Sequence, residues 1–469
     1  RNSSTVPFVT GWRRRRGPVV SESPWTLDHG GRHDGPVTMV AGTTFLVSSG
    51  AGTVSDRGSH GLFALDSRVL SKWRLSITGR PLEHLTFVPS GPFSGSFVAR
   101  VEADGRHEPT AVVLERRHVG RGMREDIEIR NYGDDCDLEI WLEFDADFAG
   151  LFDVKSGHLA DEHETRVTAR TLAAGGVVLE LSDGQPAVTA VVVRSSEAPN
   201  QIAGGGKAFA WHVSLARSES WTTCLEVGIR HGDREIDVAH PCGQPVEEAI
   251  PVSRLRSWRE AVPKLSSANL QLDAMVRRSI EDLGALRIFD PDHVDRVVVA
   301  AGAPWFMALF GRDSLLASWM TLPFDQALAR GVLAELADNQ GVRTNPSTEE
   351  EPGRILHEVR FDRLSEQLLG GANTYYGTVD ATPLFVMLAA ELVRWAGVTR
   401  ETHDLMPAVD RALEWIRRFG DRDGDGFVEY LRASATGLEH QGWKDSWDGI
   451  RDRDGSVVDP PIALCEVQG

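Results

Sequence analysis

Two hydrophobic patterns divide the chain, and the change between them falls near residue 243. Before that point, short apolar stretches alternate with turn signals. Residues 126–130 alternate polar and apolar side chains with period two, and Asn131-Tyr132-Gly133 ends the run. Many short strands separated by Gly and Asp turns are typical of an antiparallel β-sandwich. We place this domain at residues 36–242.

The second pattern has helical spacing. Residues 243–266 form a charged connector that proline interrupts, which predicts a partly helical linker. From residue 267 onward, apolar positions such as Leu272, Met275, Val276 and Ile280 fit an amphipathic helix. Gly, Pro and Asn mark the joints between the later helices, which the pattern predicts at 312–322, 325–340, 380–397 and 404–419. We therefore predict an all-α domain at 267–469, with function in its loops.

Composition narrows the classes of partner. The chain has 469 residues, a net charge of −18, and a hydrophobic share of 41%. This acidic balance argues against nucleic acid, whose phosphates require a basic surface. The one basic run, at residues 13–16, lies in a tail at 1–35 that we predict to be a disordered arm. No apolar stretch reaches the roughly 18 residues of a membrane span, and the sequence assigns no oligomeric state.

Cysteine usage predicts neither a metal framework nor a disulfide scaffold. No two cysteines form a C-x-x-C pair, and no hydrophobic secretory segment opens the chain, which begins with Arg1. A reducing cytoplasm is the resulting expectation. The four cysteines are Cys136, Cys224, Cys242 and Cys465.

Residues 441–448, Gln-Gly-Trp-Lys-Asp-Ser-Trp-Asp, are the strongest chemical signal. A carboxylate held between the faces of Trp443 and Trp447 is poorly solvated, which would raise the pKa of Asp445. A carboxylic acid that stays protonated near neutral pH can protonate the leaving oxygen of a glycosidic bond. The alternative is a structural loop, in which the Trp side chains fill the core and the Asp side chains cap a helix.

Two further loops combine aromatic and charged residues. In residues 304–314, Arg312 and Asp313 could bind sugar hydroxyls, with Trp305 closing the pocket. In residues 375–383, Tyr376 and Asp380 could serve a sugar site in the same way. For both loops the alternative is structural: core packing of the rings and helix capping by the carboxylates.

Other motifs are weaker. His357-Glu358 lacks the spacing of a zinc motif, so we predict no metal there. The acidic turn Asp421–Asp425 resembles the start of an EF-hand loop, but Arg432 occupies the twelfth position, where a Glu is required. A tight turn is the favoured reading, and a calcium site of another kind stays open. Glu466 could point into a site or lie on the surface.

Taken together, these motifs resemble bacterial amylo-α-1,6-glucosidases, relatives of the glucosidase half of glycogen debranching enzymes. The N-terminal half is similar through residues 61–68 and Trp73. The resemblance implies an (α/α)6 six-hairpin barrel after the sandwich, inverting hydrolysis of α-glucans, Asp445 as the general acid, and no cofactor. The substrate-binding residues that it implies are Trp305, Arg312, Asp313, Tyr376, Asp380, Trp443, Lys444 and Glu466.

The chain departs from that family in length. Twelve helices of about 11–12 residues plus long loops need roughly 300 residues or more, whereas 203 follow residue 266. We expect only the first half of the barrel here, without the catalytic base. The hypothesis is that this chain alone has little glucosidase activity. Robust glucose release from an α-1,6-linked oligosaccharide would contradict it.

Two other functions stay open. One is a trehalase-like enzyme or another α-glucosidase, which a substrate panel would separate from a debranching activity. The other is a non-catalytic carbohydrate-binding protein that uses the sandwich and the aromatic loops. Sugar binding without turnover would favour the latter.

Overall fold

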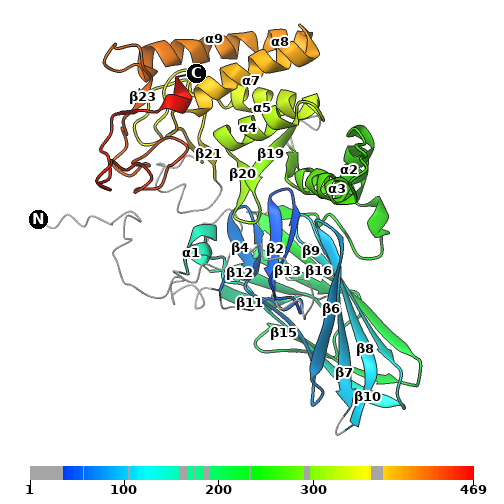
Figure 1. Ribbon diagram of the computed structural model, residues 1–469. Coiled ribbons are helices and arrows are strands. Elements are labelled where there is room, and N and C mark those ends of the chain that lie inside the picture. The colour runs from blue at the N-terminus through cyan, green and yellow to red at the C-terminus, as the bar shows by residue number, and fades with distance from the viewer. Residues whose placement is uncertain are drawn as a thin grey trace, which may run out of the picture.

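A computed structural model describes residues 35–468 except 56–57, 104–105, 158–166, 174, 183–189, 232–233, 290–295 and 361–372. The predicted N-terminal arm and its basic run lie outside the described residues. The described chain forms a β-rich part and a helical part, which lie at the bottom and top of Figure 1. None of its described helices is both long enough and apolar enough to cross a membrane.

The β-rich part consists of antiparallel sheets, as the alternating pattern predicts. Its elements are β1 (Val37–Ala41), β2 (Thr44–Ser48), β3 (Gly61–Ala64), β4 (Ser67–Leu70), β5 (Lys72–Ile77), β6 (Leu82–Gly91), β7 (Ser94–Ala103), β8 (Arg106–Val119), β9 (Met123–Asn131), β10 (Cys136–Asp145), α1 (Leu151–Ser156), β11 (Val167–Thr171), β12 (Val177–Leu181), β13 (Ala190–Ser195), β14 (Gln201–Ala203), β15 (Ala208–Leu215), β16 (Ser220–His231) and β17 (Arg234–Ile236).

Two of these sheets enclose the main core. One has nine strands in the order β11-β12-β13-β16-β9-β8-β7-β6, with β17 paired to β16, and the other has the order β14-β15-β10-β5. Inward side chains such as Ile127, Ile129, Leu142 and Phe144 are fully buried between them. In β9, buried positions alternate with more exposed ones, because successive side chains point to opposite faces of a strand.

The third sheet, β1-β2-β3-β4, joins the two parts of the molecule. Every residue of β2 is buried, which explains its continuous apolar run. Leu46 faces the sandwich core. Phe45, one residue earlier, packs on the opposite face together with Met307 of the helical part. Both faces of this sheet are therefore covered.

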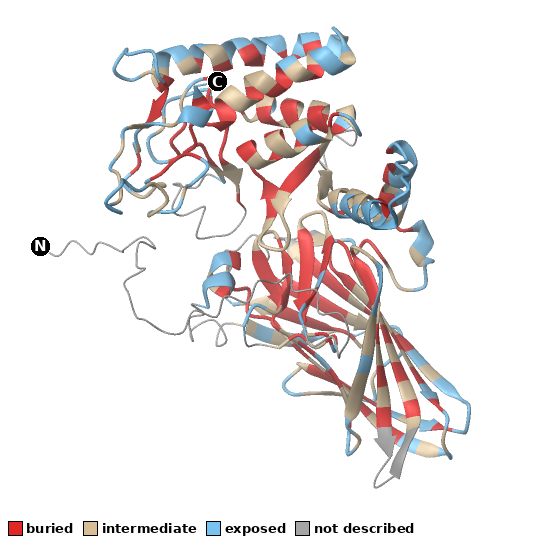
Figure 2. Cartoon of the chain, in the orientation of Figure 1, coloured by how far each residue is buried: buried red, intermediate tan, exposed pale blue. Residues whose placement is uncertain are grey.

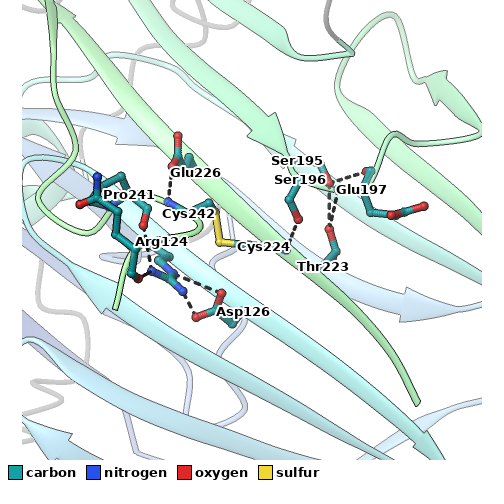
Figure 3. The surroundings of a disulfide bond; sticks show 11 residues. Arg124, Asp126, Ser195, Ser196, Glu197, Thr223, Cys224, Glu226, Pro241 and Cys242 are labelled. Atoms are coloured by element: carbon teal, nitrogen blue, oxygen red, sulfur yellow. Dashed lines mark hydrogen bonds and ion pairs between the residues drawn. A yellow bond between two sulfur atoms is a disulfide. The ribbon is translucent and has the colours of Figure 1, made fainter. Parts of the chain in front are cut away.

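A disulfide corrects the expectation drawn from the cysteine pattern. Cys224 in β16 is bonded to Cys242, 18 residues later, where the chain leaves the sheet (Figure 3). Arg124 holds the same segment by donating to the carbonyl of Pro241 at 2.9 Å. Local patterns could not predict this pairing, because the two cysteines meet only after the chain turns back along the sheet.

The helical part begins with the predicted connector. In chain order it contains η2 (Val246–Glu248), α2 (Ile250–Ala261), α3 (Leu270–Ala285), β18 (Arg287–Phe289), β19 (Val297–Gly302), β20 (Phe306–Leu309), α4 (Gly311–Thr321), α5 (Gln326–Asp338), β21 (Glu358–Val359), β22 (Thr374–Tyr375), α7 (Ala381–Ala396), α8 (Arg400–Asp404), α9 (Met406–Trp415), η3 (Ile416–Gly420), β23 (Glu429–Tyr430), β24 (Ile462–Ala463) and η4 (Cys465–Val467).

The prediction of an all-α second half is wrong, because the described part of this half also contains a three-stranded sheet and the two-stranded sheets β21-β22 and β23-β24. Strands β18, β19 and β20 form a three-stranded sheet, which packs beneath α4 and α5. Figure 2 shows buried stretches of β19 and β20 at the junction of the two parts, whereas β18 is only partly buried. The apolar run at Val297–Gly302 was too short for periodicity to separate a strand from a helix. Helices α4, α5, α7 and α9 share a second core that includes Leu315, Val332 and Phe385.

The predicted apolar face of α3 is only partly used. Ile280 and Leu283 pack against Trp258 of α2. Met275, at the other end of the helix, is 60% exposed. The helical spacing correctly identified the helix, but the apolar positions near its start lie on the surface.

Candidate functional site

Arg312 is the centre of the candidate site, and its position is set by the start of α4. Gly311 precedes it, and a Cβ at Gly311 would lie 2.1 Å from the carbonyl oxygen of Leu356. The amide of Gly311 donates to the carbonyl of His357 at 2.9 Å. Only glycine has room for this close approach. The contact holds residues 356–357 over the start of α4, where Arg312 is buried.

Arg312 joins three segments that are far apart in the sequence. Its Nη1 donates to Asp380 Oδ2 at 2.9 Å and to the carbonyl of Gly442 at 3.0 Å. Its Nη2 donates to Asp445 Oδ2 at 3.2 Å, and the guanidinium lies 5.6 Å from the centre of the Trp443 ring. The structure therefore brings together four residues that the sequence singled out: Arg312, Asp380, Trp443 and Asp445.

Asp380 acts as a partner of Arg312 rather than as a helix cap. It stands at the N-cap position of α7, but its side chain makes no capping hydrogen bond. Its Oδ2 binds Arg312, and its Oδ1 accepts from the hydroxyl of Thr378 at 2.6 Å. The capping alternative that the sequence left open for Asp380 is therefore not the arrangement found.

Neighbouring loops hold the 441–445 segment in place. The carbonyl of Gln441 accepts from the amide of Val379 at 2.7 Å, and the buried Gln441 side chain accepts from Arg354 at 2.9 Å. At Gly442, a Cβ would lie 2.1 Å from Leu464 Cδ1 and 3.8 Å from Glu466 Oε1. Glu466 thus lies beside the carbonyl that Arg312 binds.

The carboxylates around Arg312 have different environments. Burial raises the pKa of Asp313, and the positive groups Arg312 and His357 offset this rise only in part. Burial lowers the pKa of Arg312, but Asp380, Asp313 and Asp445 outweigh that effect and leave it raised. Arg312 therefore stays charged, while Asp313 holds a proton more readily than an ordinary Asp.

Asp445 and the two Trp residues near it are all partly exposed. Its side chain is 39% exposed, and Trp443 and Trp447 are 60% and 50% exposed. The loop is held by its contacts with Arg312 rather than by packing into a hydrophobic core. Water therefore reaches the rings of Trp443 and Trp447. The desolvation that the sequence suggested for Asp445 is found at Asp313 instead.

The remaining predicted residues lie in other surroundings. Trp305 packs between the two parts of the molecule, with its ring edge-on to Phe63 at 5.6 Å. The hydroxyl of Tyr376 donates to the carbonyl of Asn339 at 2.9 Å, and burial raises its pKa to about 12. Lys444 is exposed and makes no hydrogen bond with a described residue.

Sequence reasoning missed a second buried arginine that supports the site. Arg354 donates to the carbonyls of Thr378 and Glu349 and to the side chain of Gln441. Glu349 has a left-handed backbone conformation with φ of 60° and accepts from the amides of Ala433 and Ser434. Neither residue lies in an aromatic motif, so the sequence carried no signal for them.

The acidic turn places four carboxylates together. Oxygen atoms of Asp421, Asp423, Asp425 and Glu429 all lie within 4.8 Å of one another. Carboxylate oxygens are the ligands that calcium uses. Several of them already accept backbone amides, such as Gly424 on Asp421 at 2.8 Å. Hydrogen bonds within the turn are therefore another explanation of why these carboxylates lie together.

Comparison with known proteins identifies the β-rich part. Residues 39–226 match the family model of the N-terminal domain of (some) glycogen debranching enzymes. This range contains the motif at 61–68 and Trp73, so the resemblance of the N-terminal half is confirmed at the level of this domain. The chain matches no curated protein sequence.

Three solved structures show only distant likeness. A protein assigned as a kojibiose phosphorylase, from the human microbiome, has 9% identity and a TM-score of 0.47 over 84% of this chain and 58% of its own. A rhamnosidase from Klebsiella oxytoca with bound rhamnose has 10% identity and a TM-score of 0.27, over 76% and 59%. A protein assigned as an aldose 1-epimerase, from Escherichia coli K12, has 10% identity and a TM-score of 0.26, over 42% and 99%. The chain thus spans less than two thirds of the length of the first two.

Proposed function

We propose that the helical part carries the sugar-binding portion of a glycoside hydrolase that acts on α-glucans, of the amylo-α-1,6-glucosidase type. One observation carries this proposal. Arg312 gathers two carboxylates, a backbone carbonyl and an exposed Trp ring from segments up to 133 residues apart. The match of residues 39–226 to a debranching-enzyme domain supports the choice of substrate.

The arrangement suits a sugar ring. Trp443 offers a flat, accessible apolar face against which the C–H face of a sugar can pack. Arg312 presents N–H donors and Asp380 presents acceptor oxygens, and hydroxyl groups bind both. In this proposal, Asp445 exchanges its contact with Arg312 for the glycosidic oxygen and takes up a proton from solvent. The resulting carboxylic acid donates that proton to the leaving oxygen and becomes a carboxylate.

The proposal assigns an acid but no base. Inverting hydrolysis requires a second carboxylate about 6.5–9.5 Å from the acid, with a water between them. Helices α4, α5, α7 and α9 would belong to an (α/α)6 barrel, and we assign the base to none of the described residues. Glu466, beside Gly442, is placed with the substrate rather than with the attacking water.

Binding of a glucan by the chain tests this proposal. Isothermal titration with panose, which contains an α-1,6 bond, should show saturable binding that Arg312→Gln removes. Arg417→Gln, at an exposed arginine in η3, is the matched control and should bind like the parent. Absence of binding by the parent chain, or equal binding by all three proteins, would refute the proposed site.

A further inference from the structure

A groove in the β-rich part lies outside the candidate site. It has a volume of about 540 Å³ and is lined by residues of β5, β6 and the loop around Gly52. Strand β5 ends one sheet of the sandwich and β6 ends the other. The groove therefore occupies the open side where the two edge strands face each other. Ligand sites of proteins have volumes of roughly 300–1,000 Å³.

The floor of the groove contains a buried carboxyl group. Glu115 lines the groove, and its side chain is only 9% exposed. Burial and, second, the neighbouring Glu125 raise its pKa well above the ordinary value. Arg117, which pairs with Glu125, lies 3.9 Å from Glu115. The raised pKa favours the uncharged form of Glu115, which shares a hydrogen bond with Glu125 and repels an anion less than an ordinary carboxylate would.

The rim of the groove is positively charged. Arg74 and Arg80 both line it, and neither forms an ion pair or side-chain hydrogen bond with a described residue. The whole chain has a net charge of −18, whereas the rim of this groove carries two positive guanidinium groups, so its local charge is opposite to that of the chain. Guanidinium groups bind carboxylates and phosphates with paired N–H donors.

Uncharged polar groups line the wall between rim and floor. Thr53 and Ser76 present hydroxyl groups that make no hydrogen bond with a described residue. Trp73 exchanges both of its backbone hydrogen bonds with Val54. Leu75, two residues further along β5, therefore directs its N–H and C=O to the same side, where the groove lies.

We propose that this groove binds a small hydroxylated anion, a sugar phosphate or a sugar acid, with the anionic group on Arg74 and Arg80 and the hydroxyl groups on Thr53, Ser76 and the backbone of Leu75. The shared chemistry is a polyol with one anionic group. This site is separate from the Arg312 site, and it would make the β-rich part a ligand-sensing domain rather than only a support for the helical part.

Titration of the full chain with four probes tests the proposal: glucose 6-phosphate, gluconate, glucose and inorganic phosphate. The first two should bind saturably, and their relative affinities distinguish a phosphate from a carboxylate ligand. Glucose and inorganic phosphate each satisfy only part of the groove and should bind at least about tenfold more weakly, a difference of about 1.4 kcal/mol.

Three variants locate the binding. Arg74→Gln and Arg80→Gln should each weaken binding of the better sugar anion about tenfold. Arg170→Gln, an exposed arginine on β11, is the matched control and should have no effect. Arg74→Gln and Arg80→Gln should leave the binding of panose unchanged, which separates this proposal from the one above. Unchanged thermal unfolding of the Gln variants would show that they fold.

Two results would overturn the proposal. One is absence of saturable binding by either sugar anion at millimolar concentration. The other is binding that survives both Arg74→Gln and Arg80→Gln, which would place the anion elsewhere. Binding of glucose as tight as that of glucose 6-phosphate would likewise contradict the role of the two guanidinium groups.

Discussion

Arg117 in the β-rich part and Arg312 in the helical part each have four partners of the same three kinds. Arg117 contacts Glu125, Glu115, the carbonyl of Gly52 and the ring of Phe97. Arg312 contacts Asp380, Asp445, the carbonyl of Gly442 and the ring of Trp443. Each arginine therefore has two carboxylates, one carbonyl and one aromatic ring.

The two clusters differ in exposure. The side chains of Arg117 and Glu125 are both 0% exposed, whereas Asp445 is 39% exposed. A charge pair that water cannot reach loses heavily when one partner is removed, because the other charge is left buried. A pair with one exposed member can exchange that member for a ligand at little cost. Under the proposed function, the same set of contacts serves stability around Arg117 and ligand binding around Arg312.

Glu125→Gln should give the largest loss of stability. It leaves Arg117 buried without its closest counter-charge, which costs about 3–5 kcal/mol. Loss of Glu125 also removes a cause of the raised pKa of Glu115, so Glu115 can ionise and partly compensate. We therefore expect a loss of unfolding free energy near 3 kcal/mol, measured by urea denaturation.

The matched control is Glu128→Gln, on the same strand. Glu128 pairs with Arg116, and both side chains are partly exposed, at 28% and 44%. Its loss should cost less than about 1 kcal/mol. Equal losses of unfolding free energy for the two variants would contradict the distinction between buried and partly exposed ion pairs.

Asp380→Asn should have an intermediate effect. Asp380 is buried and binds both Arg312 and Thr378, but Arg312 keeps Asp445 as a counter-charge. A lost charged hydrogen bond in such a place costs about 1–3 kcal/mol. Thermal unfolding should show this loss, together with weaker glucan binding. Asp404→Asn, in an exposed surface pair, is the control and should change neither quantity.

The hydrophobic pattern predicted more of the fold than of the site. Alternation located strands such as β9, and helical spacing located α7, because both depend on local periodicity. The strand β19 and the Cys224–Cys242 disulfide depend on contacts between distant segments, so no local pattern revealed them. The (α/α)6 barrel stays a prediction.

The same difference between local pattern and distant contact applies to the residues of the candidate site. Arg312, Asp380 and Asp445 were found because each stands in a loop with aromatic neighbours. Their contact with one guanidinium group depends on the tertiary structure, so the sequence did not predict it. Solvation also depends on the tertiary structure. The sequence suggested a desolvated carboxyl group at Asp445, but that side chain is 39% exposed, and burial instead raises the pKa of Asp313.

Glu115→Gln should have a smaller effect, and one that depends on pH. The pKa of Glu115 is raised in the folded protein above its ordinary 4.5. The native state therefore holds a proton that the unfolded state releases, and stability falls as the pH rises through the window above 4.5. Gln has no proton to lose, so unfolding free energies at pH 5 and pH 8 should differ less in the variant than in the parent. A parallel pH dependence in both proteins would show that Glu115 is ionised.

Asp445→Asn should change stability least and chemistry most. Because Asp445 is partly exposed, its pair with Arg312 contributes less than about 1 kcal/mol, and the thermal midpoint should hardly move. Glucan affinity should persist, because Asn still accepts from Arg312. In any version of the protein that releases glucose, this release should be lost, since an amide cannot donate the proton. Asp313→Asn is the discriminating comparison, because burial favours the protonated form of Asp313. If Asp313→Asn stops glucose release and Asp445→Asn does not, the acid is Asp313, and the exposed carboxylate only holds the substrate.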